Sequence, residues 1–465
     1  MGKLTKLSGF IDSHLHMLGL GYTKSNISLE EAKSKKEVIS LLKKSQSKTI
    51  IIGKGWNQEE FIYKKFLTKA DLNKVSLTIP VIAIRICGHV LVVNDAMLKL
   101  AKIDNNKGIN GGSFDINTGI FKEKAMDLIY NKIPIPNKND LKEYFIKANK
   151  IMLENGITSV ASDDFSIFPI SYEEIISVIN ELYKENLIQV KITEQVNISI
   201  DELRSFIKKG YVNKRFVKFK LGPLKIIADG SLGGKTAALR EPYMDDANNL
   251  GIKLYTDIEL FEKVYLADSF GMDVVIHAIG DAAINQAINA IIKSLKITKR
   301  KNHHHALIHA QLATKSQIKL MKEWNIGAIV QPIFLNTDIS IVKSRIGSRY
   351  KESYLFKTMY NLDLKVGFST DSPIEPINPF YNLYTAIHRK SIKNNKLQPL
   401  LLEEAFELKE ALDCYTKNNL HYIYEDKQEE SDYIIIDRPL NKNDLLNTNV
   451  LKTYIDGILV YNKIK

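Results

Sequence analysis

From about residue 151 onward, the chain alternates between short apolar segments and amphipathic segments of helical period. The apolar segments have the length and composition of buried strands, so we predict seven strands in this region and one more at Gly9–His14. Strands that alternate with helices form parallel sheets, because each helix returns the chain to the start of the next strand. The seven later strands are predicted at Gly156–Ser162, Ile188–Val196, Leu221–Asp229, Met272–Ile279, Ala306–Ala310, Ile326–Gln331 and Lys365–Thr370.

Eight alternating units favour closure of the sheet into a TIM-like (β/α)8 barrel of the α/β class. Residues 17–150 do not follow this rhythm, and we predict that they form an insertion after the first strand, over the barrel mouth. We assign residues 1–427 to the barrel with its insertion, and residues 428–465 to a small, reduced β-sandwich appendage. The predicted strands of the appendage are Asp432–Asp437 and the segment Thr453–Tyr461, with a turn at Asp456-Gly457.

Charge and composition restrict the possible partners. The net charge is +12, but the lysines are scattered and mixed with acids, so we expect a solvated basic surface and no nucleic-acid partner. Two cysteines, Cys87 and Cys414, imply no disulfide framework and suit a reducing compartment. With no apolar run of about 18 residues and no signal-peptide pattern, we expect a cytoplasmic protein without a membrane partner.

The segment Ile11–His16 contains the pattern His-x-His. Residues i and i+2 of an extended chain point to the same side, so His14 and His16 can reach one metal ion together. The pattern is weak by itself, because surface or core histidines produce it as well. Its interpretation therefore depends on what lies at the ends of the other predicted strands.

Further metal-ligand residue types lie toward the carboxyl ends of later predicted strands, at Lys225, His277, His309 and Asp371. In a barrel these strand ends converge on one face, where active sites of this fold lie. Imidazole and carboxylate groups suit zinc, iron or manganese. The sequence therefore predicts a divalent metal site at the carboxyl-terminal face of the barrel.

The motifs resemble amidohydrolase family 3 of the amidohydrolase superfamily, the branch that includes N-substituted formamide deformylases. The order His-x-His, Lys, His, His, Asp is the ligand order of that superfamily, and the resemblance runs from about residue 9 to 460. The matching segments are Gly9–His16, Arg85–Asn94, Lys225–Leu239, His277–Asp281, Gln331-Pro332 and Asp371–Glu375.

The resemblance implies a role for each ligand type. The four histidines would bind one or two divalent ions, with zinc expected first and iron or manganese as alternatives. Asp371 would bind metal and carry the proton as the catalytic residue. Lys225 matches the lysine that is carboxylated by CO₂ and bridges two metals, which requires a neutral amine and therefore a pKa lowered by burial. An ion-paired lysine is the alternative interpretation.

Four residues of the insertion are candidates for binding a small-molecule substrate. Arg85 and His89 supply a cation and an imidazole for a substrate carbonyl or carboxylate, or else form a structural ion pair. Glu123 matches a family glutamate, and Trp56 lies in a stretch like the Gly-Trp segment of the family. The run His303–His305 resembles a metal tag, but it follows a basic run and precedes a strand, so we predict a loop.

The predicted reaction is hydrolysis of a C–N bond in an amide, N-formyl amine or cyclic amide by metal-activated water. Deamination or ester hydrolysis on the same site is the nearer alternative, and an inactive, basic nucleic-acid-binding protein is the more distant one. Two features depart from the family pattern. The first is Ile308, which stands where an acid usually precedes the sixth-strand histidine. The second is the position of the first motif, which begins at Gly9, whereas family members usually have β-strands ahead of it. The strands of the appendage are therefore expected to pack on the barrel or to be completed in a homodimer.

Overall fold

The computed structural model describes residues 4–45, 49–85, 89–103, 112–426 and 430–463. It divides into two compact units, one formed by Met1–Gly21 together with Lys138–Lys465 and the other by Tyr22–Asn137. The second unit thus begins within helix α1 (Met17–Ser25) and ends just before helix α6 (Lys138–Glu154), a narrower range than the expected insertion at 17–150.

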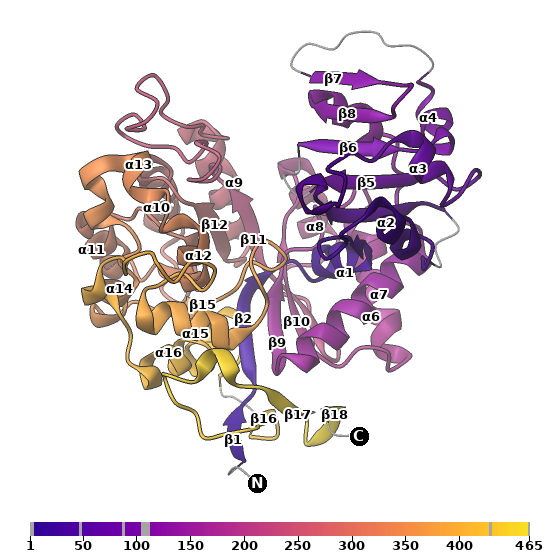
Figure 1. Cartoon of the computed structure of the whole chain (residues 1–465). Helices are drawn as coiled ribbons and strands as arrows, with labels where there is room; N and C mark the ends of the chain where they lie inside the picture. The colour runs from indigo at the N-terminus through magenta and orange to yellow at the C-terminus, as the bar shows by residue number, and fades with distance from the viewer. Residues whose placement is uncertain (1–3, 46–48, 86–88, 104–111, 427–429, 464–465) are drawn as a thin grey trace. The chain divides into compact units, whose positions relative to one another are not determined.

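The first unit contains an eight-stranded parallel sheet in the order β15-β14-β13-β12-β11-β10-β9-β2. Several of its strands are labelled in Figure 1. Each strand pairs with its neighbour in the chain, as in a (β/α)8 barrel, and the predicted fold is confirmed. The strands are β2 (Phe10–Leu15), β9 (Ile157–Ser162), β10 (Lys191–Val196), β11 (Phe219–Ile227), β12 (Val274–Ala278), β13 (Ala306–His309), β14 (Gly327–Val330) and β15 (Val366–Phe368).

Hydrogen bonds between the first strand and the segment after the last one close the barrel. The buried Asp12 accepts hydrogen bonds from the backbone N–H and the hydroxyl of Thr370, and Ser13 donates to the carbonyl of Phe368. The backbone N–H of Asp371 donates to the carbonyl of His14 at 2.9 Å. Closure therefore places two predicted metal ligands, His14 and Asp371, side by side although they lie far apart in the sequence.

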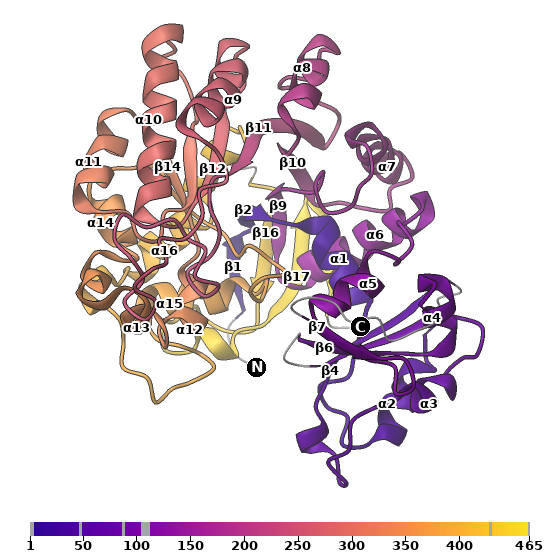
Figure 2. The ribbon, with the colours of Figure 1, turned by 90° about the horizontal axis from the view of Figure 1, so that it is seen from above.

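Helices surround the strands (Figure 2). Several begin at capping boxes, in which a Ser or Thr side chain and an acid or amide three residues later satisfy each other's backbone N–H groups. Such boxes lie at Ser199, Thr256 and Thr314. Apart from α1 and α6, the helices of this unit are α7 (Tyr172–Lys184), α8 (Ile200–Lys208), α9 (Asp257–Ser269), α10 (Asp281–Thr298), α11 (Lys315–Glu323), α12 (Leu335–Asp338), α13 (Val342–Ile346), α14 (Phe356–Asn361), α15 (Pro379–His388) and α16 (Leu408–Cys414).

The predicted appendage is a four-stranded antiparallel sheet in the order β1-β16-β17-β18, at the lower end of Figure 1. Its strands are β1 (Thr5–Ser8), β16 (Tyr433–Ile436), β17 (Val450–Ile455) and β18 (Ile458–Asn462). Strand β1 was not predicted from the sequence, because Thr5–Ser8 is only four residues long and Leu7 is its only apolar side chain. Ile434, Ile436 and Val450 belong to the barrel's hydrophobic core, so the sheet packs on the barrel.

The unit Tyr22–Asn137 has its own sheet, in the order β3-β4-β5-β6-β8-β7. Two antiparallel strands of this sheet lie at 81–85 and 90–93, and residues 86–88 between them lie outside the described residues. The elements are β3 (Ile27–Ser28), β4 (Ile51–Trp56), β5 (Val81–Arg85), β6 (Val90–Val93), β7 (Gly112–Asp115), β8 (Ile120–Glu123), α2 (Lys35–Leu42), α3 (Lys69–Asn73), α4 (Asp95–Ala101) and α5 (Asp127–Tyr130).

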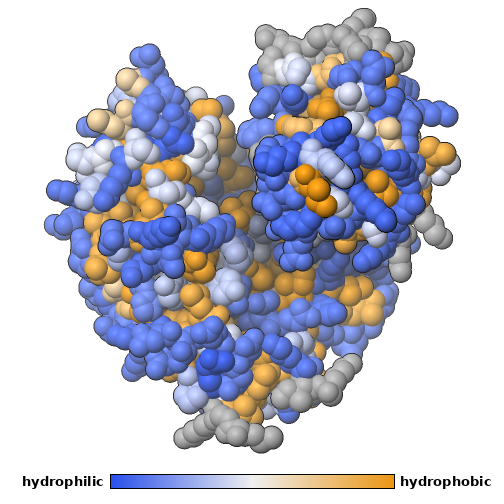
Figure 3. Space-filling model, in the orientation of Figure 1, coloured by the Kyte–Doolittle hydropathy of each residue, from blue (hydrophilic) through white to orange (hydrophobic). Residues whose placement is uncertain are grey.

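Hydrophilic residues cover most of the face drawn in Figure 3, with hydrophobic residues between them. Among the described residues, no helix is both long enough and apolar enough to span a bilayer.

Candidate metal centre

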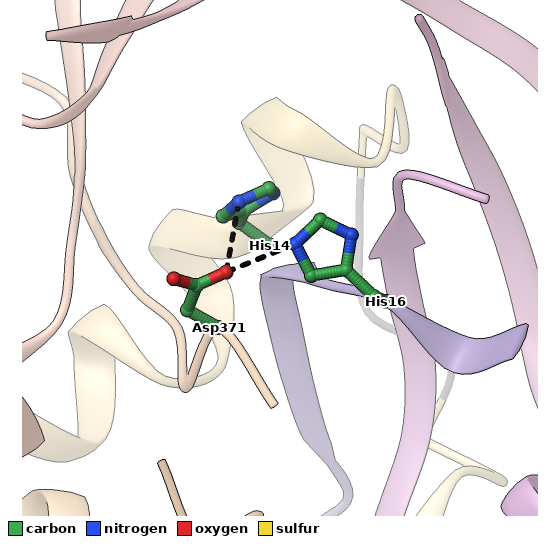
Figure 4. Close-up of side chains that lie close together, drawn as sticks. All are labelled: His14, His16 and Asp371. Atoms are coloured by element: carbon green, nitrogen blue, oxygen red, sulfur yellow. Dashed lines mark hydrogen bonds and ion pairs between the residues drawn. The ribbon is translucent and has the colours of Figure 1, made fainter. Parts of the chain in front are cut away.

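Three of the predicted ligands meet where the first and last strands of the barrel come together (Figure 4). His14 lies in β2, His16 follows that strand, and Asp371 follows β15. Asp371 Oδ1 lies 3.3 Å from Nε2 of His14 and 3.1 Å from Nε2 of His16. The three ligand atoms lie within 4.8 Å of one another, so one cation can contact all of them.

The other predicted ligands adjoin this group. The ring centroids of His309 and His14 are 6.0 Å apart, and those of His277 and His309 are 4.4 Å apart. Nζ of Lys225 lies 3.2 Å from Nε2 of His14. The structure therefore brings together all six predicted metal-binding residues, which come from the first, fourth, fifth, sixth and eighth strands of the barrel or directly follow them.

Each histidine of the centre has one ring nitrogen hydrogen-bonded to a protein oxygen, which leaves the other nitrogen for a different partner. Histidines that bind metals show this arrangement, because the outer bond sets the orientation of the ring. The donor set fits a divalent transition metal, because it consists of four imidazoles and the carboxylate of Asp371, with which one of the imidazoles pairs. The outer pairs are His14 Nδ1 with Gln195 Oε1 (2.6 Å), His16 Nδ1 with the Asp163 carbonyl (2.8 Å), His277 Nε2 with the Gly230 carbonyl (3.2 Å) and His309 Nδ1 with Gln331 Oε1 (2.7 Å).

Burial keeps most of these rings neutral. Burial, together with the nearby Lys225, lowers the pKa of His14 to about 4 and that of His277 to about 3, and burial lowers the pKa of His309 well below its usual value. Neutral imidazole is the form that binds metal ions. Burial also lowers the pKa of Lys225, although Asp163 and Asp371 oppose the shift.

His16 behaves differently because it pairs with Asp371. Burial alone would lower the pKa of His16, but the hydrogen bond and charge of Asp371 raise it to about 9. Burial alone would raise the pKa of Asp371. The hydrogen bonds and charges of His14 and His16 outweigh burial and hold that pKa well below its ordinary value. A cation that binds here must therefore displace a proton from His16.

Two of the predicted ligands have unusual backbone conformations. His309 and Asp371 have φ angles of 73° and 57°, in the left-handed region that non-glycine residues seldom adopt. Such conformations cost on the order of 1–3 kcal/mol and cluster at functional sites, where the surrounding structure holds them. Both residues directly end or follow a barrel strand, so the strain lies where the side chains turn toward the centre.

Sequence reasoning missed four residues that support the centre, namely Asp163, Gln195, Asp229 and Gln331. Asp163 directly follows β9, and its Oδ2 lies 4.0 Å from Nζ of Lys225. The carboxylate of Asp229 accepts hydrogen bonds from the backbone N–H groups of residues 238, 279 and 280, and its Oδ1 lies 3.5 Å from Nε2 of His277. A signal was available for two of them, because Asp229 and Gln331 lie in the matching segments Lys225–Leu239 and Gln331-Pro332, but no role was assigned to either residue.

The four candidate substrate-binding residues belong to the unit Tyr22–Asn137. Trp56 is fully buried in the core of that unit and donates to the carbonyl of Ala83. His89 and Glu123 form an exposed pair at 3.1 Å. Arg85 donates to Gln58 and Asn57. Substrate binding by these residues stays a prediction.

The chain resembles known proteins over nearly its whole length. The model of the Amidohydrolase family matches residues 5–461. The putative amidohydrolase YtcJ of Bacillus subtilis (strain 168) is 30% identical, over 98% of this chain and 88% of that protein. The N-substituted formamide deformylase of Arthrobacter pascens is 23% identical, over 52% of this chain and 46% of that enzyme. An uncharacterized metal-dependent hydrolase from Pyrococcus horikoshii OT3 has a solved structure with a TM-score of 0.79 and 30% identity, covering 94% of this chain and 87% of that one.

Proposed function

Because this chain belongs to the amidohydrolase family and is a hydrolase, we propose that it cleaves the C–N bond of a small amide, N-formyl amine or cyclic amide at a divalent metal centre. The observation that carries the proposal is the convergence of four histidines and Asp371 at the carboxyl-terminal face of the barrel. Each ring has one nitrogen held by a protein oxygen, as a metal ligand requires.

We assign the binding of one or two ions to His14, His16, His277, His309 and Asp371, with zinc as the expected metal. When bound, such an ion would polarise a carbonyl group and make water a stronger acid. The buried amine of Lys225, whose pKa is lowered, is the candidate for carboxylation by CO₂. Its new carboxylate would add an oxygen ligand next to His14, whose Nε2 lies 3.2 Å from the amine.

Asp371 is the proposed proton carrier. Its Oδ1 faces His14 and His16, so we assign proton transfer to the second oxygen, Oδ2. In this assignment Oδ2 takes the proton from the attacking water and then delivers it to the leaving nitrogen. Its low pKa keeps the group ionised and able to accept that proton at neutral pH.

The proposed cleavage of a C–N bond is supported by the metal-binding residue types and by one of the relatives. An N-substituted formamide deformylase is among the relatives, and that enzyme supports N-formyl amines as the first substrates to test. A metal ion can polarise the carbonyl of any amide, so other amides are candidates as well. The substrate panel should therefore contain N-formyl amines, simple amides and cyclic amides, each with a matched ester.

The test combines metal analysis with this panel. We expect one or two transition-metal ions per chain, amide hydrolysis that stops after chelation, and recovery of activity on adding Zn²⁺. A content below about half an ion per chain after reconstitution would contradict the metal centre. Hydrolysis of the esters without any amide would retain the centre but contradict the proposed C–N bond specificity.

A further inference from the structure

Two glutamines, one beside His14 and one beside His309, stand in the same relation to their histidines. Gln195 Oε1 lies 2.6 Å from His14 Nδ1, and Gln331 Oε1 lies 2.7 Å from His309 Nδ1. All four side chains are buried, with at most 2% of their surface exposed. The outer partners of the other two histidines of the centre are backbone carbonyls, which a substitution cannot remove.

The partners of each amide nitrogen determine how the amide is oriented. Gln195 Nε2 donates to the carbonyl of Ser13 at 3.0 Å. Gln331 Nε2 donates to the hydroxyl of Ser369 at 2.7 Å and to the carbonyl of Ile329 at 3.3 Å. A carbonyl oxygen only accepts hydrogen bonds, so the NH₂ group must face it and the amide oxygen must face the imidazole.

The amide orientation in turn determines the tautomer of each ring. An amide oxygen cannot donate, so a hydrogen bond to it requires that Nδ1 of the histidine carries the hydrogen. In a neutral imidazole the other nitrogen, Nε2, then holds the lone pair. For both His14 and His309, Nε2 is the nitrogen that is left for the metal centre, as the outer bonds use Nδ1.

We propose that Gln195 and Gln331 are positioning residues that hold His14 and His309 in the Nδ1–H tautomer and keep both Nε2 lone pairs available to the metal. The inference rests on the proposed metal centre. Without the amide oxygen, either ring can rotate or place its hydrogen on Nε2, where it blocks metal binding. Removing an outer partner of this kind typically costs about 10- to 100-fold in metal affinity.

The test compares two substitutions of Gln331 in the full chain. Gln331→Met removes the acceptor at similar volume, whereas Gln331→Glu keeps an oxygen there, and the hydroxyl of Ser369 can turn to donate to it. Zn²⁺ is titrated into the metal-free protein in competition with a chromophoric chelator. We expect the dissociation constant for Zn²⁺ to rise about 10- to 100-fold in Gln331→Met and to stay within about threefold of the parent in Gln331→Glu.

Gln286→Met is the matched control. Gln286 is a buried glutamine of α10 that donates to the carbonyl of Tyr255 and to Asp257, and its side chain holds no imidazole. We expect this variant to lower the unfolding temperature of the metal-free protein while its Zn²⁺ affinity stays at the parental value. A loss of affinity in Gln286→Met equal to that in Gln331→Met would assign the effect to general destabilisation and overturn the inference.

The outcomes separate this inference from the proposed function. If the parent chain binds no Zn²⁺, the metal centre and this inference both fail. If the parent binds Zn²⁺ but Gln331→Met binds it within about twofold, or if Gln331→Glu loses as much affinity as Gln331→Met, the inference alone fails. Gln195→Met repeats the measurement on His14, so the test is still decided if one variant does not fold.

Discussion

Two histidine-rich regions lie at opposite ends of the barrel strands. At the carboxyl ends, each of the four candidate histidine ligands has one ring nitrogen bonded to a protein oxygen and the other left for the centre. At the amino ends, His303–His305 precede β13, as predicted for a loop. There His305 uses both nitrogens, because Nδ1 accepts the backbone N–H of Val274 and Nε2 lies 3.1 Å from Asp268 Oδ1.

The surrounding groups explain the difference between the two regions. Asp268 lies 2.7 Å from a guanidinium nitrogen of Arg300 and accepts hydroxyls from Ser294 and Thr298, so its charge is already balanced. His304 stacks on His421 with ring centroids 3.8 Å apart. A cluster of histidines and acids is therefore a candidate ligand set only where the second nitrogen of each ring faces other ligand-type side chains, as those of His14 and His16 face Asp371.

The largest expected effect is that of His14→Asn. The substitution removes one ligand and its Nε2 lone pair, so we expect metal content and hydrolysis to fall to background, measured by elemental analysis and with the substrate found for the parent. His304→Asn is the matched control in the loop and should leave metal content unchanged. Equal metal loss in both variants would contradict the distinction between the two regions.

The next effect is that of Asp371→Asn. Asparagine can keep an oxygen near the histidines and tolerates a positive φ, but it cannot shuttle a proton. We expect kcat to fall about 10²- to 10⁴-fold while the unfolding temperature changes little. A variant with near-parental kcat would show that Asp371 does not carry the proton.

Asp268→Asn should lower stability and leave activity unchanged, which is the opposite of the result expected for Asp371→Asn. It leaves Arg300 and the buried His305 without the carboxylate that both contact, so we expect a loss of about 3 kcal/mol in the free energy of unfolding. Activity per folded molecule should stay at the parental level, because Asp268 lies at the amino ends of the strands. Denaturant unfolding and initial rates measure the two quantities, and a large drop in kcat would contradict the separation.

A smaller effect is expected in how the stability of the protein depends on pH. Burial alone would raise the pKa of Asp268, but hydrogen bonds from His305, Ser294 and Thr298 outweigh it and hold that pKa well below its ordinary value. A lowered pKa in the folded state contributes stability above the unfolded pKa of about 4, and this contribution is lost as the pH falls further. Unfolding of the metal-free protein between pH 5 and pH 3 should therefore show a smaller loss of stability in Asp268→Asn than in the parent.

Much of the barrel could be predicted because its strands carry their own signal. The strands predicted at Gly156–Ser162 and Met272–Ile279 are observed as β9 and β12, with shifts of at most two residues at each end. Thr5–Ser8 has no such signal, since it becomes a strand only by pairing with β16. Trp56 received its predicted substrate-binding role from a motif, and a motif does not encode the full burial of this side chain in the core of its own unit.

The sequence by itself determined the fold class and the chemistry available to it, because hydrophobic period and residue type are local properties. It placed imidazoles and a carboxylate at strand ends that a barrel must bring together. Only the tertiary structure decided which nitrogen of each ring is left for the centre, which glutamines hold His14 and His309, and how the histidines of the loop are satisfied. Those outcomes depend on hydrogen bonds such as that between His14 and Gln195, which lie 181 residues apart and meet only when the barrel has closed.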